Sequence, residues 1–290
     1  MPLRVLHCPV NLAGVGWTNV QALRRKGVDA RLLLYFRSPF RLDELDVYVE
    51  RPQSFVRRQL VQLRTLAQVL PETDIFHFLG ADIRETPREQ LGYGLKADAR
   101  IVGSYAALRF VPFDAHVVPP GLELDRYTPA PANGSDDTIR IVHAPSNKEK
   151  KGTEYVIRAV EELKRRYPVE LDVVHGVPNS EAIQRYRRAD IVVDQVLRDW
   201  HGVFTIEAMA LGKPVVTSLD ADAVRETEQA FGVELPVLAA TKDDLAEKLA
   251  WLIERPEERT RRGVAGRAYV EQVHDVDRMA DRLLAIYNQL

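Results

Sequence analysis

The sequence predicts an α/β protein made of two doubly wound parallel-sheet domains that face each other across a cleft. Three observations lead to this prediction. Short apolar stretches alternate with amphipathic helical stretches, one segment rich in Pro, Gly and Asn interrupts the alternation, and 290 residues suffice for two domains. Because ligands of such sheets bind beyond the carboxyl ends of the strands, we expect a ligand cleft between the two domains.

The first domain is expected to span residues 1–130. In chain order, its expected strands are residues 4–10, 28–35, 45–49, 74–78, 99–103 and 116–118, and its expected helices are residues 17–26, 52–70 and a short one capped by Ser104. The first strand, helix and strand form a βαβ unit, in which Gly27 ends the helix. The helix over 52–70 is expected to turn these apolar side chains inward: Phe55, Leu60, Leu63, Leu66 and Val69.

Three local features of this domain carry little functional information. The glycine-containing turn at 11–16 lacks the third glycine of a dinucleotide fingerprint, so it either faces the cleft or is a plain tight turn. His77 lies on a strand and is expected to be a core histidine. Cys8 is the only cysteine, which excludes an intrachain disulfide, and its place at the end of a strand predicts a buried thiol.

The second domain is expected to span residues 137–275, followed by a C-terminal helix over 276–290. The linker before it consists of turn-forming residues, among them Pro129, Pro131, Asn133, Gly134, Ser135 and Asp136. Its expected strands are residues 138–143, 169–175, 190–196 and 214–218, and its expected helices begin at the caps Thr153, Ser180 and Thr241 or span 203–211, 220–231 and 256–273.

The composition of the chain and the absence of certain motifs exclude several classes of protein. The net charge is −2, with 17 basic and 14 acidic side chains in residues 1–127 and 23 and 28 in the remainder, which argues against a nucleic-acid binder. The slightly basic first half suits an anionic acceptor or a membrane surface, although the excess is small. The seven histidines lack metal-binding spacing, and the motifs of Ser-His-Asp hydrolases and P-loop kinases are absent.

Targeting signals are missing as well. No stretch approaches the roughly 18 apolar residues of a membrane span, and the first residues lead directly into a strand rather than a signal peptide. We therefore expect a cytoplasmic protein, in either a free or a membrane-peripheral form.

The most informative stretch covers residues 199–218, D-W-H-G-V-F-T-I-E-A-M-A-L-G-K-P-V-V-T-S. It is typical of a polar loop, a short apolar helix, a turn at Gly212 and a buried strand. Gly202 lets a ligand approach the backbone, and the helix that follows offers free N–H groups and its positive dipole end to an anion. The carboxylates of Asp199 and Glu207 suit sugar hydroxyls. The alternative is a plain helix under a sheet, with Glu207 solvated.

This stretch resembles the signature of family 4 of the GT-B glycosyltransferases. That signature consists of a Glu, seven further residues, and a second Glu that opens E-A-M-A-x-G-x-P-V. Residues 207–216 match the second part, and Asp199 stands where the first Glu is expected. Three further segments are similar to the family: residues 118–129, which resemble the end of its first domain, residues 139–152, its donor loop, and residues 186–193, its Tyr…Ala-Asp segment.

The resemblance implies the GT-B fold, with two Rossmann-like domains and a C-terminal helix that crosses back onto the first. It implies an enzyme that moves a sugar from a nucleotide-diphosphate sugar to an acceptor, which is a saccharide, a lipid or a small molecule. Members of the family retain the anomeric configuration and need neither a metal nor another cofactor.

The resemblance also assigns roles to individual residues. Lys151 would neutralise the donor diphosphate as the glycosidic bond breaks, Glu207 would hydrogen-bond the ribose, and Asp199 would touch the donor sugar. Backbone contacts to sugar and phosphate would come from Gly202, Val203 and Phe204.

The sequence departs from the family in four respects. Asp199 is one methylene shorter than Glu. Ser146 and Pro145 stand where many members have an Arg, so Lys148 would substitute, as a point charge rather than a bidentate fork. Residues 79–82 resemble a loop whose His is missing, and the first domain is short. These departures keep two alternatives open: a nucleotide-sugar epimerase of GT-B fold, and a catalytically weak nucleotide-sugar-binding or assembly protein.

Overall fold

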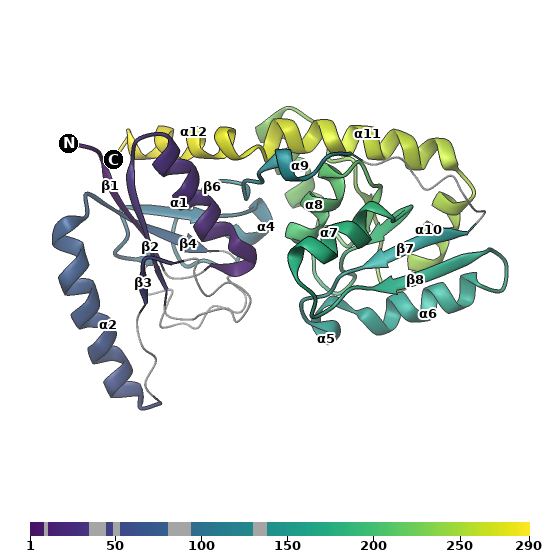
Figure 1. Cartoon of the computed structure of the whole chain (residues 1–290), viewed down its shortest axis with the longest axis horizontal. Helices are drawn as coiled ribbons and strands as arrows, with labels where there is room; N and C mark the ends of the chain where they lie inside the picture. Colours follow the sequence, from purple (N-terminus) through teal and green to yellow (C-terminus); the bar gives the residue numbers. More distant parts are fainter. Residues whose placement is uncertain (9–10, 35–44, 49–52, 81–93, 130–137) are drawn as a thin grey trace. The chain divides into compact units, whose positions relative to one another are not determined.

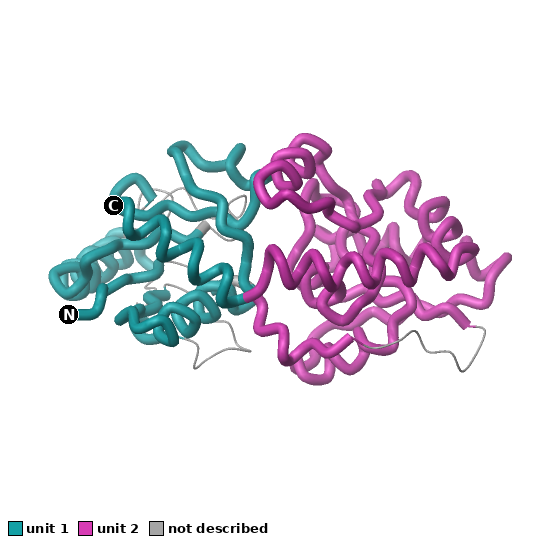
Figure 2. The backbone as a smooth tube through the Cα atoms, turned by 90° about the horizontal axis from the view of Figure 1, so that it is seen from above, with its two compact units in different colours: residues 1–121, 276–290 teal, residues 122–275 magenta. Residues whose placement is uncertain are grey.

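The computed structural model describes residues 1–8, 11–34, 45–48, 53–80, 94–129 and 138–290. The chain forms two compact units: unit 1 contains residues 1–121 and 276–290, and unit 2 contains residues 122–275 (Figure 2). Each unit is a parallel sheet accompanied by helices, which confirms the predicted fold class of two parallel-sheet α/β domains. The expected linker at 131–136 lies outside the described residues.

The sheet of unit 1 has the strand order β3-β2-β1-β4-β5-β6, and every pairing is parallel (Figure 1). The strands are β1 (Arg4–Cys8), β2 (Asp29–Leu34), β3 (Val47–Tyr48), β4 (Ile75–Gly80), β5 (Ala99–Val102) and β6 (His116–Val117). Chain order reverses between β1 and β4, so this is the topological switch point of the sheet. His7 on β1 lies directly beside His77 on β4.

The helices of unit 1 include one from the far end of the chain. They are α1 (Val15–Arg25), α2 (Phe55–Val69), α4 (Tyr105–Leu108) and α12 (Val276–Tyr287), with short 3₁₀ turns at Leu12–Gly14 and Leu70–Glu72. Helix α12 packs against α1, and the ammonium of Lys26 lies 2.8 Å from the Asp281 carboxylate. The last residue of α12, Tyr287, hydrogen-bonds His77.

The structure of unit 1 confirms some of the predicted features and corrects others. Cys8 and His77 are fully buried and Ser104 caps α4, as predicted. Helix α1 begins at Val15, two residues earlier than predicted, directly after a 3₁₀ turn over Leu12–Gly14. The predicted inward face of α2 is wrong for Leu60 and Leu63, whose exposed fractions are 61% and 56%.

The sheet of unit 2 has the parallel order β11-β10-β9-β7-β8, with its switch point between β7 and β9. The strands are β7 (Ile139–His143), β8 (Val169–Val173), β9 (Ile191–Val193), β10 (Val215–Thr217) and β11 (Leu238–Ala239). The helices are α5 (Lys148–Lys151), α6 (Thr153–Leu163), α7 (Asn179–Arg187), α8 (Val203–Ala210), α9 (Ala221–Phe231), α10 (Leu245–Ile253) and α11 (Pro256–Val273). Short strands of Ile and Val form the core with α6 and α10.

Several details of unit 2 differ from the prediction, among them the start of α10, which has Asp244 rather than Thr241 in the cap position. Thr153 is not a helix cap, because its hydroxyl bonds His143 and Gly152 precedes the helix in the cap position. Ser180 lies inside α7, whose cap is Pro178. Residues 122–129, which the sequence assigns to the first domain, belong to unit 2, where the N–H of Leu122 donates to the carbonyl of His274 at 2.7 Å.

Among the described residues, every helix is too short or too polar to traverse a lipid bilayer.

Candidate functional site

The candidate site lies in unit 2, where the loops after β7 and β9 leave the carboxyl edge of the sheet on either side of the switch point. The β7 loop contains the single turn α5, which Asn147 caps by accepting from the N–H of Lys150. Gly152 ends α5 with φ +79°, a left-handed conformation that favours glycine. A Cβ at Gly152 would also lie 2.6 Å from Val196, so the loop must carry glycine directly after Lys151.

Lys151 and the β9 loop meet at one carboxylate, that of Asp194. The lysine–aspartate cluster consists of Lys151, Asp194, Gly202 and Thr205. Its Lys151 ammonium lies 2.8 Å from Oδ1 of Asp194, while Oδ2 accepts from the Gly202 N–H at 2.6 Å and from the Thr205 hydroxyl at 2.9 Å. A Cβ at Gly202 would lie 3.0 Å from Nζ of Lys151, so glycine is needed here for space rather than for backbone freedom.

The cluster keeps a charged pair inside the protein. The Asp194 side chain is inaccessible to solvent and that of Lys151 is 14% exposed. Burial acts to raise the pKa of Asp194, but the Lys151 charge and the hydrogen bonds from Lys151, Gly202 and Thr205 outweigh it, and the pKa is lowered. Asp194 is therefore ionised at neutral pH and lies at the N-terminus of α8, where the helix dipole favours a negative charge.

His143, the last residue of β7, connects the segments that carry the cluster. Its Nδ1–H donates to the carbonyl of Val193 at 2.9 Å, so the neutral ring accepts at Nε2 from the Thr153 hydroxyl, also at 2.9 Å. Burial lowers the pKa of this histidine and keeps the ring neutral. The imidazole thereby joins the ends of β7 and β9 to the start of α6.

Helix α8 carries a second polar contact, the glutamate–tyrosine pair of Glu207 and Tyr127. The Tyr127 hydroxyl donates to Oε1 of Glu207 at 2.8 Å, and the side-chain amide of Asn179 lies 3.5 Å from the same oxygen. Burial and the Glu207 charge raise the pKa of Tyr127, so this phenol stays protonated and acts as a donor. The neighbouring Tyr186 packs on Phe204 with ring centroids 4.6 Å apart.

The structure brings some of the predicted site residues together and leaves others apart. Lys151 and Gly202 meet at Asp194, and Val203 and Phe204 form the first turn of α8, whose N–H groups have no acceptor within the helix. Glu207 lies further along the same helix. The other two predicted residues lie apart from the cluster. Asp199 lies in the loop before α8, where its backbone carbonyl accepts from the N–H of Asp220 at 2.7 Å. Lys148 is the exposed first residue of α5.

The sequence reasoning missed Asp194, Thr205 and Tyr127. Asp194 left one signal, because a carboxylate that directly follows the apolar run Ile191–Val193 stands at the carboxyl end of a buried strand. Thr205 and Tyr127 are ordinary residues in their segments, and only the tertiary structure brings them to Asp194 and Glu207.

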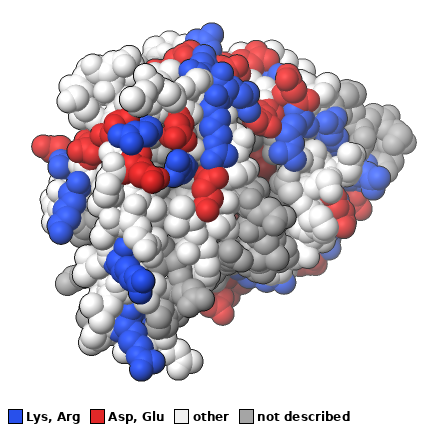
Figure 3. Space-filling view, turned by 60° about the vertical axis from the view of Figure 1, so that its left-hand side comes forward, with Lys and Arg blue, Asp and Glu red and all other residues white. Residues whose placement is uncertain are grey.

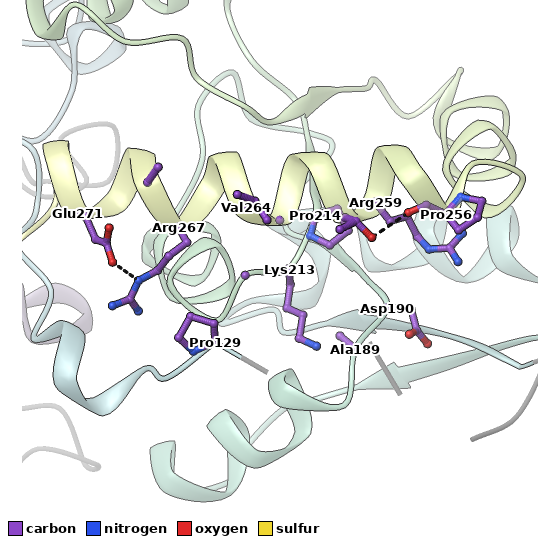
Figure 4. Close-up of a pocket in the computed structure, with 14 residues that line it drawn as sticks. Pro129, Ala189, Asp190, Lys213, Pro214, Pro256, Arg259, Val264, Arg267 and Glu271 are labelled. Atoms are coloured by element: carbon purple, nitrogen blue, oxygen red, sulfur yellow. Dashed lines mark hydrogen bonds and ion pairs between the residues drawn. The ribbon is translucent and has the colours of Figure 1, made fainter. Parts of the chain in front are cut away.

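Other parts of unit 2 are less suited to binding a nucleotide. Among the described residues, no group of three or more His, Cys, Asp or Glu side chains is placed to hold a metal ion. A cavity of about 530 Å³ under α11 is bordered by Asp190 and Lys213, which precede β9 and β10, so it lies at the amino edge of the sheet (Figure 4). Its Arg267 is held by Glu271 at 2.6 Å and by the carbonyls of Tyr127 and Ala210.

A comparison with protein-family models gives one finding. Residues 140–285, half of the chain, match a family described as glycosyl transferase-like. The match includes β7, α5, the β9 loop and α8, and therefore the whole lysine–aspartate cluster. A comparison with curated protein sequences finds no significant match.

Solved structures with the same fold cover the whole chain. HepE of Anabaena, in complex with UDP and glucose, has a TM-score of 0.71 and 14% identity over 99% of this chain and 100% of its own. A glycosyltransferase of Rickettsia africae has a TM-score of 0.71 and 15% identity, covering 99% and 98% of the two chains. Sucrose-phosphate synthase of Thermosynechococcus elongatus has a TM-score of 0.67 and 14% identity, with coverages of 100% and 99%. At these identities the likeness establishes the GT-B fold.

Proposed function

The chain belongs to the glycosyl transferase-like family and is a glycosyltransferase, and from this premise we propose that its donor is a nucleotide-diphosphate sugar bound by unit 2 at the lysine–aspartate cluster. One observation carries the proposal. The Lys151 ammonium and the Gly202 amide converge on a single anion, the Asp194 carboxylate, at the switch point of the sheet and at the N-terminus of α8. HepE was solved with UDP and with UDP-glucose, which supports a UDP-sugar as the donor.

In this proposal Asp194 positions Lys151 for the diphosphate. An ammonium has three N–H donors, and the bond to Asp194 uses one of them, which leaves two for phosphate oxygens. The N–H groups of Val203 and Phe204 at the start of α8 add further donors. As the glycosidic bond breaks, negative charge grows on the departing diphosphate, and these fixed donors stabilise it more than they stabilise the intact donor.

The remaining assignments complete the reaction. Glu207 binds the ribose hydroxyls, and Tyr127 holds the carboxylate in place for this contact. Asp199 contacts the donor sugar from the loop before α8. The cations and helix-end amides take the place of a metal, the transition state is oxocarbenium-like and the anomeric configuration is retained. The acceptor is an unidentified saccharide, lipid or small molecule.

The test is a thermal-shift series with UDP, GDP, ADP and their sugar conjugates, with and without EDTA. A ligand at a hundred times its dissociation constant stabilises a protein by about 2.7 kcal/mol, which raises the melting temperature measurably. We expect one nucleotide to give a shift that EDTA leaves unchanged and that Glu207→Ala and Lys151→Met abolish.

Glu247→Ala on α10, where the side chain is 79% exposed, is the control and should keep the full shift. The proposed donor site would be refuted if no nucleotide raised the melting temperature, or if both site variants responded like the wild type. Conversion of the nucleotide sugar in the absence of any acceptor would identify an epimerase instead.

A further inference from the structure

Helix α2 of unit 1 turns its most apolar face to solvent. The exposed fractions are 64% for Val56, 61% for Leu60 and 56% for Leu63, and Leu70 at the helix end is 38% exposed. Steps of four, three and seven residues place these side chains on one side of a helix, together with the exposed Ala67. We call these five residues the α2 stripe. Figure 1 shows α2 at the periphery of unit 1.

The opposite side of α2 packs on unit 1 with apolar and polar side chains, and Val61, Leu66 and Val69 belong to or contact the core cluster there. Gln62 is buried there, with 5% exposure, beside Leu66 at 6%, and Thr65 bonds the carbonyl of Val61 within the helix. A surface helix ordinarily faces the core with its apolar side and water with its polar side. Helix α2 has an additional apolar side that faces water, which indicates that something other than the core of unit 1 covers the α2 stripe.

The charge of α2 identifies the kind of partner. Residues 55–70, F-V-R-R-Q-L-V-Q-L-R-T-L-A-Q-V-L, contain three arginines and no acidic residue. Arg57 and Arg64 are exposed and lie two turns apart along one border of the α2 stripe. Figure 3 brings this side of the molecule forward and shows, at its lower left, basic groups among uncharged ones without acidic groups beside them.

We propose that the α2 stripe docks on an anionic lipid bilayer. A helix with apolar side chains on one face and arginines at its border lies in the plane of a membrane interface, with the apolar groups at the acyl boundary and the arginines at lipid phosphates. A second copy of the chain fits less well. Two antiparallel α2 helices joined along the stripe would bring the bordering arginines of both copies together without an acidic partner. The proposal does not depend on the donor site.

The experiment is co-sedimentation of the full chain with vesicles of phosphatidylcholine, alone or mixed with phosphatidylglycerol. We expect binding to the mixed vesicles only, and weaker binding at high salt. Leu60→Gln with Leu63→Gln should reduce the affinity for the mixed vesicles at least tenfold. Arg57→Gln with Arg64→Gln should reduce it about thirtyfold, because each basic residue near an anionic surface contributes about 1 kcal/mol to binding. All variants should keep the wild-type melting temperature, since the replaced side chains are exposed.

Two matched controls separate the α2 stripe from exposed residues in general. Val264→Gln on α11 replaces an apolar residue that is 68% exposed, and Arg165→Gln with Arg166→Gln removes two exposed arginines from unit 2; both should bind like the wild type. The proposal is overturned if the wild type ignores anionic vesicles, or if the α2 variants bind as well as the controls. A dimer that Leu60→Gln with Leu63→Gln dissociates, without vesicle binding, would make a second copy the occupant.

Discussion

Both sheets carry buried polar groups where their strand order reverses, but the two groups differ in charge. In unit 1, the rings of His7 and His77 lie 3.9 Å apart, and the Tyr287 hydroxyl is 2.5 Å from Nδ1 of His77 and 3.3 Å from Nε2 of His7. Burial lowers the pKa of His7 to about 3 and that of His77 well below the usual value, so both rings are neutral. In unit 2 the loops that leave the switch point hold the salt bridge between Lys151 and the ionised Asp194.

The difference shows that polar groups near the switch point of a sheet can serve two purposes. The neutral cluster is completed by α12, whose Tyr287 supplies the polar partner, and it fixes that helix to unit 1. The charged cluster is completed by the first residues of α8, a helix end suited to anions. We therefore expect disruption of the first cluster to reduce stability alone, and disruption of the second to reduce both stability and nucleotide binding.

The largest effect is expected from Asp194→Ala. This change leaves Lys151 largely buried without its counter-ion, together with the unpaired Gly202 amide, and should lower the free energy of unfolding by about 3–5 kcal/mol. Urea unfolding at pH 7 measures the loss, and a thermal shift with UDP tests for the accompanying loss of binding.

The control for this change is Asp172→Ala. Asp172 pairs with Arg185, but the two side chains are 35% and 30% exposed, so the loss should be only about 0–1 kcal/mol. A similar loss of stability in both variants would show that burial does not increase the effect of removing one partner of an ion pair. The double variant Lys151→Met with Asp194→Leu should recover much of the stability while still failing to bind UDP.

Acid should weaken unit 1 through its histidines. Their pKa values are lowered in the folded state, so the unfolded chain binds more protons at any pH between the folded and unfolded values. The contribution of these histidines to the free energy of unfolding is therefore fully present above about pH 6.5. It falls as the pH decreases toward 3, by up to about 1.4 kcal/mol per pH unit for each histidine. Urea unfolding at pH 7, 6 and 5 measures the slope, which His7→Gln should reduce and His116→Gln, at an exposed position, should not.

Tyr287→Phe tests whether the neutral cluster of unit 1 is structural. Removal of the hydroxyl leaves Nδ1 of His77 buried without this partner, which should cost about 1–3 kcal/mol of stability. The response to UDP should remain that of the wild type, because the cluster is structural. A weakened UDP response in this variant would contradict the separation of roles. Tyr167→Phe, whose hydroxyl bonds the exposed Glu254, is the control and should change stability little.

The smallest effect is expected from Tyr127→Phe. This change removes one hydrogen bond to Glu207 and should lower the free energy of unfolding by about 0.5–1.5 kcal/mol. Because Glu207 loses its fixed orientation, titration calorimetry should also show weaker nucleotide binding, up to about tenfold. Unchanged affinity would mean that Tyr127 stabilises the fold without orienting the carboxylate, and Tyr155→Phe on α6 provides the baseline.

The apolar strands were predictable because their information is local: β7, β9 and β10 are short and rich in Ile and Val. Lys151-Gly152 was singled out by the resemblance of residues 139–152 to a family segment, and the structure shows why a glycine must follow Lys151 in this turn. Asp194 was predicted to lie within a strand, but its partners come from a residue 43 positions earlier and from the N-terminus of α8, which no local pattern reveals.

Helix α2 illustrates the other limit. Its sequence has apolar residues on two sides, one containing Leu66 and Val69 and the other containing Leu60 and Leu63. Periodicity identifies both sides but not the one that packs, because that choice depends on the sheet beneath. In the structure the first side faces inward and the second faces solvent, which is why the predicted core residues of this helix were half wrong.

The return of α12 to unit 1 has a consequence for synthesis on the ribosome. Unit 2 is one continuous segment, residues 122–275, whereas unit 1 lacks its helix α12 until residues 276–290 have been translated. Domains usually fold in the order in which they emerge, but here the segment made second can finish first. Until then, His77 lacks the Tyr287 hydroxyl, and the side of α1 that α12 covers is exposed. While residues 122–275 are being made, the nascent chain therefore carries a complete N-terminal sheet without its last helix, an interval in which chaperone contact would matter most.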